Sequence, residues 1–419
     1  MDGSAAGSGS SAPASPARRP WRGRRVLLGV TGGIAAYKVV HVARDLTRLG
    51  AAVDVVLTHS AQAFVGTISF ESVTGRQVHT GFAEGGALDH IRLARECDVV
   101  CVAPATADFL ARAAAGHADD LLTTILLATR APVLLCPAMN DAMWAHVQTQ
   151  RNAAHVADVL GYRLVGPATG PLAFGEGSGP GRLEEPGVIV QHVGRALQSD
   201  GPLSDRKVVV TAGPTREAID PVRVITNRSS GRMGFELAAA AWRRGADVVL
   251  VHGPSSAPLP HGPRSVAVES TEEMAAAVRA ELRDAGVLIM AAAAADFRPT
   301  DPAAMKIRKD ERPSAIALTD ATDILMSTKE ARPPGLVTVG FALETDSALE
   351  RARDKLKRKT LDLIVLNEPA ADAGFEVETN RVTMISAAGD NEKLPVLPKA
   401  EVAERVIERV EALLRAVSI

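Results

Sequence analysis

The same local pattern occurs twice in this chain: a short apolar strand runs into a glycine turn, and a helix follows. It appears first over residues 26–38 (VLLGVTGGIAAYK) and again over residues 208–241, which begin VVVTAGPT. In an open α/β sheet this junction can hold a phosphate, because glycine lets the backbone approach closely and the helix N-terminus offers unpaired N–H groups. Two copies about 180 residues apart predict two nucleotide-handling domains in one polypeptide.

Composition supports two α/β domains. The chain has 419 residues, too many for a single core, and 46% of them are hydrophobic while only 3% are aromatic. Cores built from Val, Leu, Ile and Ala are typical of doubly wound, mostly parallel sheets. The net charge of −2 gives the whole chain no bias toward nucleic acid or an anionic membrane, and we expect neither as a partner.

The cysteines and the N-terminal segment favour a cytoplasmic location. Cys97, Cys101 and Cys136 are an odd set beside apolar runs, which argues against a disulfide framework and against a zinc site. Residues 1–25 are rich in Gly, Ser, Ala and Pro and end in several arginines, so we predict a disordered basic arm, with weak anion or partner binding as an alternative. No apolar stretch approaches the ~20 residues that span a bilayer.

The first domain is predicted over residues 26–198. Between residues 166 and 182 the sequence is too glycine-rich for a helix or a strand, so a loop that is either functional or disordered is expected there. A helix over 186–198 closes the domain, and 199–206 is a linker. Strands separated by helical patterns, which predict parallel βαβ units, are expected at 26–31, 52–57, 98–103, 132–136 and 162–166.

The second domain, residues 207–419, repeats this plan as a Rossmann-like domain with a small β-hairpin extension. Ser270 and Glu273 predict a capping box. The polar stretch 297–313 reads as a mobile loop. Strands are expected near 207–212, 246–251, 287–292, 336–341 and 362–366, a terminal hairpin at 381–386 and 394–397, and a final helix at 399–415.

Several segments of the first domain directly follow predicted strands, where an open α/β sheet collects its ligands. They are Thr31–Gly33, Pro104–Asp108 and the block 137–144 (PAMNDAMW), and a short helix with His90 lies between them. Each alone has a structural explanation, such as a surface histidine or core methionines. Together, in this order, they resemble the flavin-dependent phosphopantothenoylcysteine decarboxylases over residues 25–195.

This resemblance implies a bound FMN whose phosphate lies at Gly32 and Gly33. In that family, oxidation of the substrate's thiol-bearing carbon by the flavin allows the neighbouring carboxylate to leave as carbon dioxide. The resemblance implies that His90 is the base for the thiol and that Asn140 binds the carboxylate. Further flavin contacts are expected from Thr58, Thr106 and Asp108.

One position departs from the family pattern. The lid that closes over the site carries a cysteine in the family, as the proton donor of the final reduction, whereas this chain has Phe174 there. Either a substitute donor serves, such as Glu176, water or a residue of a neighbouring subunit, or the reaction stops at the enethiol. We favour a substitute donor because His90 and Asn140 are both present.

The second domain carries its own set of motifs. The segment 227–234 (NRSSGRMG) is a small-residue turn entering an Ala-rich helix, which suits a phosphate but also an ordinary capped helix start. The motifs that follow along the chain are Ala292–Asp296, Lys306, Asp323–Leu325, Phe341, Lys355 and Lys359. On their own, Lys355 and Lys359 would fit a solvated helix face. This set resembles the phosphopantothenate–cysteine ligases over residues 205–415.

The ligase resemblance implies activation of the phosphopantothenate carboxylate by CTP, with Mg²⁺, and displacement of CMP by cysteine. Asn227 and Arg223 would stabilise the acyl-cytidylate, and Lys306 would neutralise phosphate charge. Asp296 is a candidate Mg²⁺ or ribose contact. The residues implied in CTP binding are Ala292, Asp296, Lys306, Thr322, Asp323, Ile324, Leu325, Phe341, Lys355 and Lys359.

A decarboxylase followed by a ligase is the arrangement of the bacterial bifunctional coenzyme A biosynthesis enzymes, and the ligase product is the decarboxylase substrate. The resemblance further implies a homo-oligomer as large as a dodecamer. Two alternatives stay open. One is an active ligase fused to a non-catalytic flavin-fold scaffold, which Phe174 favours. The other is an NAD(P)-dependent reductase, which the missing G-x-G-x-x-G fingerprint disfavours.

Overall fold

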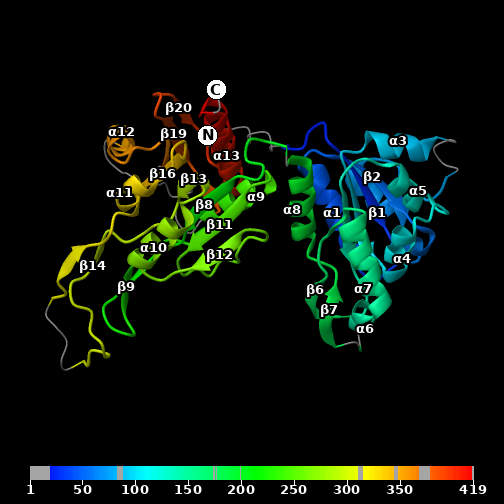
Figure 1. Cartoon of the computed structure of the whole chain (residues 1–419), viewed down its shortest axis with the longest axis horizontal. Helices are drawn as coiled ribbons and strands as arrows, with labels where there is room; N and C mark the ends of the chain where they lie inside the picture. The colour runs from blue at the N-terminus through cyan, green and yellow to red at the C-terminus, as the bar shows by residue number, and fades with distance from the viewer. Residues whose placement is uncertain are drawn as a thin grey trace, which may run out of the picture. The chain divides into compact units, whose positions relative to one another are not determined.

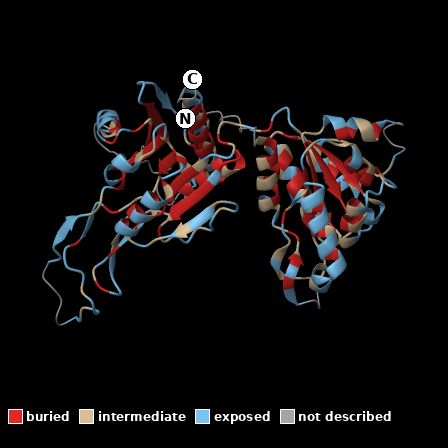
Figure 2. Ribbon diagram, viewed as in Figure 1, coloured by how far each residue is buried: buried red, intermediate tan, exposed pale blue. Residues whose placement is uncertain are grey.

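The computed structural model describes residues 19–82, 88–172, 175, 177–198, 200–309, 315–343, 348–367 and 378–417. The chain divides into two compact units, residues 1–190 and 191–419 (Figure 1). This division falls inside helix α8 (Pro186–Gln198), which the sequence analysis assigned as a whole to the first domain. In both units the buried residues concentrate in the sheet and on the helix faces that cover it (Figure 2).

The first unit is built on a parallel sheet with strand order β2-β1-β3-β4-β5. The strands are β1 (Arg25–Val30), β2 (Ala52–Leu57), β3 (Val99–Ala105), β4 (Val133–Pro137) and β5 (Arg163–Leu164). All five lie where apolar runs predicted strands. Their rows of Val, Leu and Ala are almost wholly buried because helices cover both faces. This order is the flavodoxin-like one, and it reverses between β1 and β3.

The helices of the first unit surround this sheet. Phe109, Leu110, Leu122 and Ile125 pack from two of them against β3 and β4, with exposures of 0–2%. The helices are α1 (Ala36–Arg48), η1 (His59–Ala63), α2 (Thr67–Thr74), α3 (Asp89–Glu96), α4 (Ala107–Ala115), α5 (Leu121–Ala128), α6 (Asp141–Ala145), α7 (Val147–Ala154), η2 (His155–Val159) and α8.

The glycine-rich segment 166–182 contains two strands, so the prediction that it forms neither helix nor strand was wrong. Strands β6 (Ala168–Pro171) and β7 (Ser178–Arg182) pair antiparallel within it. Glycine is needed because β7 runs against the segment before α6: a Cβ on Gly181 would lie 2.3 Å from the Met139 carbonyl oxygen, and the Gly181 backbone is at φ 141°. The Met139 N–H donates to the Gly181 carbonyl at 2.9 Å, so the hairpin is fixed to this segment.

Two predicted disordered or linking segments contribute to packing instead. The basic arm was placed at residues 1–25, but Trp21 is only 2% exposed and its backbone N–H donates to the Leu49 carbonyl, while Arg25 begins β1. Residues 1–18 lie outside the described part. In the predicted linker 199–206, Leu203 is fully buried in the core of the second unit. In both cases a single large apolar side chain holds the segment, because burying it is favourable.

The second unit contains a larger sheet with the order β12-β11-β8-β13-β16-β17-β19-β20. The strands are β8 (Lys207–Ala212), β11 (Asp247–His252), β12 (Arg264–Ala267), β13 (Ala285–Met290), β16 (Val337–Leu343), β17 (Leu363–Asn367), β19 (Val382–Ser386) and β20 (Asn391–Lys393). Strands β12 to β17 in this order are parallel, and β19 and β20 are antiparallel. The parallel part has the Rossmann order, reversing beside β8.

Helices cover both faces of this sheet. α9 (Arg232–Arg243) and α13 (Lys399–Val417) pack on one face. α10 (Thr271–Glu281), α11 (Ile324–Ser327) and α12 (Ala348–Arg358) pack on the other, with η3 (Lys329–Ala331) after α11. Ser270 caps α10 by accepting from the Glu273 N–H at 3.2 Å, as predicted, but the Glu273 carboxylate accepts from Glu269 rather than closing the box on Ser270.

Short two-stranded ribbons complete the second unit. β9 (Arg216–Ala218) pairs with β10 (Val224–Thr226), and β18 (Thr379–Asn380) pairs with β21 (Leu397–Pro398). β14 (Phe297–Pro299) pairs with β15 (Leu318–Asp320), so the start of the predicted loop 297–313 is extended structure. The terminal hairpin was predicted with the wrong partner: β19 pairs with residues 391–393 rather than 394–397, because Leu394 and Leu397 turn into the core.

Candidate functional site

A first pocket lies where the flavodoxin-like sheet reverses, at the carboxyl ends of β1, β3 and β4. Thr31, directly after β1, donates to the Pro104 carbonyl at 2.7 Å and accepts from the Thr106 N–H at 3.2 Å. Thr106 in turn caps α4 by accepting from the Phe109 N–H. These bonds lock the two strand-to-helix turns together and leave the glycine turn open to the pocket.

This pocket has a volume of about 480 Å³ and a mostly apolar wall. Residues from the turns after β1, β3 and β4 and from the β6–β7 hairpin line it: Gly32, Gly33, Ile34, Ala35, Tyr37, Lys38, Pro104, Thr106, Ala107, Ala138, Met139, Asn140, Met143, Pro171, Leu172, Gly181, Arg182 and Leu183. A Cβ on Gly32 would lie 2.5 Å from the Ser60 Cβ, whereas one on Gly33 would meet nothing closer than 3.8 Å. The turn at Gly32 therefore needs glycine for a close approach between β1 and η1.

Asn140 lies in this pocket with a free donor. Its Oδ1 caps α6 by accepting from the Ala142 N–H at 2.9 Å. Its Nδ2 has no hydrogen-bond partner among the residues that the structure describes. An amide held by its oxygen in this way points its N–H groups at a ligand without adding charge.

The remaining predicted residues of the first site lie outside this pocket lining. His90 is on α3, half-buried, with its ring 6.0 Å from the Phe82 ring. Thr58 caps η1, and Asp108 is exposed in the first turn of α4. Phe174 and Glu176 of the lid lie outside the described residues. Sequence reasoning missed Tyr37, Lys38 and Arg182 as lining residues, although the first two lie in the first turn of the helix that the glycine turn opens.

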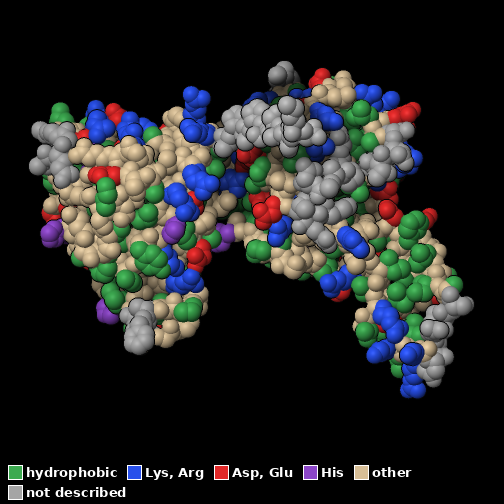
Figure 3. Space-filling model, turned by 180° about the vertical axis from the view of Figure 1, so that it is seen from behind, with side chains coloured by type: hydrophobic (Ala, Val, Ile, Leu, Met, Phe, Trp, Pro, Cys, Tyr) green, Lys and Arg blue, Asp and Glu red, His purple; other side chains and the backbone are tan. Residues whose placement is uncertain are grey.

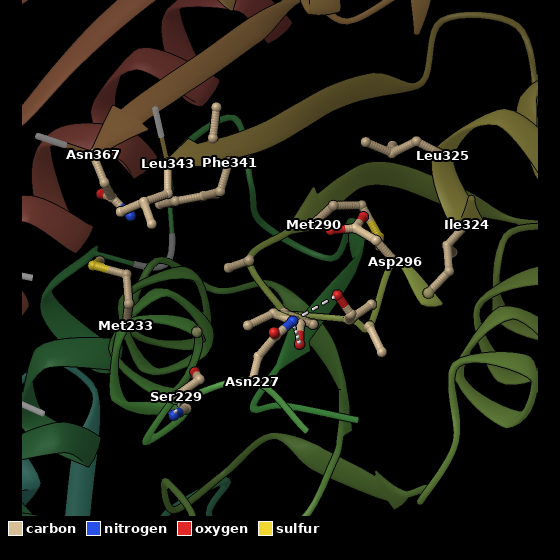
Figure 4. Close-up of a pocket in the computed structure, with 18 of the residues that line it drawn as sticks. Asn227, Ser229, Met233, Met290, Asp296, Ile324, Leu325, Phe341, Leu343 and Asn367 are labelled. Carbon is tan, nitrogen blue, oxygen red and sulfur yellow. Dashed lines mark hydrogen bonds between the residues drawn. The ribbon is translucent and has the colours of Figure 1, made fainter. Parts of the chain in front are cut away.

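A second pocket, of about 470 Å³, lies at the carboxyl ends of β13, β16 and β17 beside the start of α9. Figure 4 shows Asn227, Asp296 and Phe341 around it, with Ile324 and Leu325 on one side and Met233 and Asn367 on the other. It gathers most of the predicted ligase residues: Asn227, Ala292, Asp296, Thr322, Asp323, Ile324, Leu325, Phe341, Lys355 and Lys359.

The wall after β13 is held rigidly. The Asn227 Nδ2 donates to the carbonyls of Ala293 and Ala294, at 3.2 and 3.0 Å (Figure 4). The Ala295 N–H donates to the buried Thr215 hydroxyl at 2.9 Å, and the Ala293 N–H to the Gly213 carbonyl. The alanine run is thus fixed as an extension of the strand, with its backbone facing the cavity.

Lys359 and Asp323 form a charged part of the wall of the second pocket, at the start of α11. The Asp323 carboxylate accepts from Lys359 at 2.9 Å and caps α11 by accepting from the Met326 N–H. Partial burial alone would raise the pKa of Asp323, but the Lys359 ammonium outweighs it and holds the pKa below its ordinary value. The Asp323 carboxylate is therefore charged at neutral pH.

Arg223 and Lys306 are the predicted ligase residues that do not line the second pocket. Both belong to an extended part of the unit held by Asp220, a buried carboxylate. Asp220 accepts from the backbone N–H groups of Val222 and Arg223 at 2.8 Å, from Arg223 Nη1 at 2.9 Å and from the Ile307 N–H at 3.2 Å. Figure 3 shows Lys and Arg side chains gathered near the end of this part, which carries the exposed Lys306, Arg308 and Lys309.

Sequence reasoning missed one side of the second pocket. Asn367, Asn380 and Lys399 line it there, beside Arg232 of the predicted segment 227–234, and Lys399 is only 7% exposed. The available signal was weak, since Lys399 lies more than a hundred residues after the motifs at 292–296, at the start of an ordinary amphipathic helix. Within the described part of the chain, no group of three or more His, Cys, Asp or Glu could hold a metal ion. None of its helices is long and apolar enough to cross a membrane.

Comparisons with known proteins cover both units. The family model described as "Flavoprotein" matches residues 14–198, and the one described as "DNA/pantothenate metabolism flavoprotein C-terminal domain" matches residues 203–414. The coenzyme A biosynthesis bifunctional protein CoaBC of Vibrio vulnificus (strain CMCP6) is 42% identical over 398 residues, which are 94% of this chain and 98% of the relative. The chain belongs to the CoaBC family. The protein of the same name from Mycolicibacterium smegmatis is 43% identical over 409 residues, with coverages of 94% and 98%.

Solved structures match each half of the chain. A C-terminal domain of a CoaBC protein is 36% identical, with a TM-score of 0.45, over 52% of this chain and 99% of that one. The FMN-dependent cysteine decarboxylase SpaF is 34% identical, with a TM-score of 0.35, over 41% and 97%. Membership of the CoaBC family confirms the predicted α/β fold and the predicted function, a bifunctional enzyme of coenzyme A biosynthesis with decarboxylase and ligase activities.

Proposed function

We propose that the second unit joins 4'-phosphopantothenate to cysteine at the expense of CTP, and that the first unit decarboxylates the product with FMN to 4'-phosphopantetheine. The observation that carries this proposal is the second pocket, which gathers an amide, two carboxylates and lysines from segments far apart in the sequence. Carboxylate activation needs such a set, because it must bind a triphosphate and a carboxylate together.

In the ligase pocket, the nucleotide would lie against the backbone of Ala292. It would be bound by Phe341, Lys355, Lys359 and the segment 322–325. Asp296 would hold Mg²⁺ together with the phosphate oxygens. Asp323, the other carboxylate in the lining, is already paired with Lys359. One carboxylate is enough, since Mg²⁺ at a triphosphate keeps several waters and few protein ligands.

Two displacements complete the ligation. A carboxylate oxygen of 4'-phosphopantothenate attacks the α-phosphorus of CTP, and pyrophosphate leaves. The cysteine amine then attacks the acyl carbon and loses a proton, and CMP leaves. Asn227, which holds the backbone of Ala293 and Ala294 in place, would lie beside the acyl-cytidylate and stabilise it. Arg223 and Lys306 would neutralise the phosphate charge that develops in both steps.

The first pocket fits FMN on the geometry of its turns. Gly32 brings the backbone so close to Ser60 that a Cβ would clash, and the turn opens a helix, as a phosphate site requires. Gly32, Gly33 and Thr106 would hold the phosphate end, and Thr58 and Asp108 would add contacts at the edge. When bound, FMN supplies reversible two-electron oxidation of the thiol-bearing carbon. Asn140 Nδ2 would bind the substrate carboxylate, and His90 would take the thiol proton.

We further propose that both sites are completed by other copies of the chain. His90 lies outside the pocket that contains Asn140, and Arg223 and Lys306 lie outside the pocket that contains Asn227. Large apolar side chains are exposed near each pair. They are Ile34, Tyr37, Phe64, Ile68 and Met143 in the first unit, and Val222, Val224, Phe297, Met305 and Leu318 in the second, with exposures of 41–81%. Such patches mark interaction surfaces in soluble proteins.

A one-pot assay tests the proposal. Purified protein receives 4'-phosphopantothenate, cysteine, Mg²⁺ and either CTP or ATP, and products are followed by mass spectrometry. Formation of 4'-phosphopantetheine with CTP is the expected result. Arrest at phosphopantothenoylcysteine would make the first unit a scaffold, as Phe174 allows. No ligation with either nucleotide would overturn the ligase assignment.

A further inference from the structure

Lys399 occupies a part of the ligase pocket to which no role has been assigned above. It begins α13, lines the cavity and is only 7% exposed. Lysine is almost never buried to this extent unless its ammonium group is paired. The Lys399 ammonium group at this position therefore requires a negatively charged partner.

The fold prevents this side chain from moving out to solvent. Strand β21, directly before Lys399, pairs with β18, and the Lys399 N–H donates to the Glu378 carbonyl at 2.9 Å. Val402, Ala403 and Val406 on the following turns are fully buried against the sheet. The start of α13 is thus fixed from both sides, and the side chain of its first residue stays in the cavity.

The described groups around Lys399 leave its ammonium group without an ion-pair partner. Glu378 lies close to it in the fold, but its carboxylate is 88% exposed and pairs with Arg232 at 3.4 Å. Its side of the pocket is lined by Arg232 and by the amides of Asn367 and Asn380, which are joined by a 3.0 Å hydrogen bond. The carboxylates in the pocket lining are Asp296 and Asp323, and Figure 4 shows Asp296 near Ile324, away from Asn367. Within the residues that the structure describes, Lys399 has no ion-pair partner.

This arrangement has an electrostatic cost for the Lys399 ammonium group. Burial, and then the charge of Arg232, lower the pKa of Lys399 below its ordinary value. An ammonium group removed from water without a counter-charge destabilises the fold. Residues that lower stability in this way are typical of binding sites, where the ligand supplies the missing charge.

We propose that Lys399, with Arg232 beside it, forms a subsite for a phosphate group of a substrate. The start of α9, which lines the same side of the cavity through Gly231–Gly234, adds backbone N–H donors. The identity of the phosphate rests on the proposed function. Two substrates carry one: the nucleotide, through its triphosphate, and phosphopantothenate, through its 4'-phosphate.

The test compares Lys399→Met, which keeps the length of the side chain and removes the charge, with Lys399→Arg, which keeps the charge. Lys329→Met, an exposed lysine of η3, is the matched control. Binding of inorganic pyrophosphate to the full-length protein is measured by calorimetry, Tm by thermal unfolding, and KM separately for CTP and phosphopantothenate. A charge-assisted hydrogen bond predicts a loss of about 10- to 100-fold in pyrophosphate affinity for Lys399→Met.

We expect Lys399→Met to keep or raise Tm while it weakens pyrophosphate binding, and Lys399→Arg to restore most of the affinity. A rise in KM for CTP alone assigns the subsite to the triphosphate, and a rise for phosphopantothenate alone assigns it to the 4'-phosphate. Unchanged pyrophosphate affinity and unchanged KM values in folded Lys399→Met would overturn the proposal. An unfolded or strongly destabilised Lys399→Met would also overturn the proposal, because it would show that the ammonium group stabilises the folded protein.

These outcomes are separable from failure of the proposed function. Pyrophosphate binding needs no turnover, so a wild-type protein that makes no phosphopantothenoylcysteine would refute the ligase assignment and leave the binding comparison intact. Conversely, normal ligation by Lys399→Met with unchanged KM values would refute the subsite and leave the ligase assignment standing.

Discussion

The Nζ of Lys359 lies 2.9 Å from each carboxylate oxygen of Asp323. Both residues line the ligase pocket, and their pairing joins α11 to the end of α12 across its wall. Arg332 fixes the same corner by donating to the Lys359 carbonyl at 2.9 Å. The ammonium group is therefore already oriented before any nucleotide binds, and its orientation depends on Asp323.

We expect Lys359→Met and Asp323→Asn each to raise KM for CTP about tenfold, because the first change removes the ammonium group and the second removes the carboxylate that orients it. The double variant should be no worse than the worse single one, since residues in direct contact act as a unit. Steady-state kinetics with CTP varied would measure this, with Lys329→Met as the control. Fully additive effects would show that the two residues act separately.

Asp220 ties the Lys306 segment to Arg223 through both of its carboxylate oxygens. Burial alone would raise the pKa of Asp220, but the N–H groups of Val222, Arg223 and Ile307 and the Arg223 charge hold it below its ordinary value. In Asp220→Asn one oxygen becomes an NH₂ group that faces N–H donors, so part of the network must break. We expect the kcat of ligation to fall about tenfold through misplaced Arg223 and Lys306.

The matched control for Asp220→Asn is Asp301→Asn, an exposed carboxylate on the same segment. Decarboxylation of supplied phosphopantothenoylcysteine should be unchanged in both variants, because that reaction belongs to the other unit. Equal ligation rates in the two variants would contradict a positioning role for Asp220.

Gly32 and Gly33 offer a matched pair for the flavin site. A Cβ on Gly32 would lie within 2.9 Å of the Ser60 backbone, whereas the same atom on Gly33 would make only ordinary contacts, at 3.8 Å or more. Gly32→Ala should therefore displace the turn and lose most of its flavin, and Gly33→Ala should keep it. The visible flavin absorbance of each purified variant, relative to protein, measures the effect. Equal flavin contents in the two variants would show that the turn at Gly32 does not contribute to flavin binding.

Glu404 on α13 is buried between Arg243, the last residue of α9, and Arg244, which follows it. Burial alone would raise the pKa of Glu404, but the two guanidinium groups outweigh it and lower the pKa from 4.5 to about 2. Because the folded pKa lies below the unfolded one, the stabilisation is complete above about pH 4.5 and is lost as the pH falls toward 2. This shift corresponds to about 3 kcal/mol of unfolding free energy.

Chemical unfolding of the protein between pH 6 and about pH 3 would measure this loss. Glu404→Gln should be destabilised at neutral pH by about 3 kcal/mol, since it leaves buried arginines less compensated, and it should show a flatter pH dependence. Glu392→Gln, an exposed residue of β20, is the control. An unchanged slope in Glu404→Gln would assign the acid sensitivity to other carboxylates.

Much of the fold could be predicted because its signals are local. Strands β1 and β8 are short apolar runs that end at glycine turns. A helix of period 3.6 follows β1 directly, whereas the ribbon β9–β10 lies between β8 and α9. The predictions failed where a distant contact overrides composition. The hairpin β6–β7 forms in a glycine-rich stretch because Met139 and Asp141 require its backbone to come close. Strand β12, an exposed edge with little apolar character, was also missed.

The residues of the candidate sites were also predictable only where the signal is local. The sequence by itself determined which chemistry the chain contains, because the motifs at 31–33, 137–144 and 292–296 directly follow strands, and parallel strands bring their carboxyl ends to one edge. Only the tertiary structure decided which side chains share a cavity. It separates Arg223 and Lys306 from Asn227, holds them instead on Asp220, and brings Lys399 from the far end of the chain into the pocket. Such placements depend on helix packing and on single buried hydrogen bonds, which no local pattern encodes.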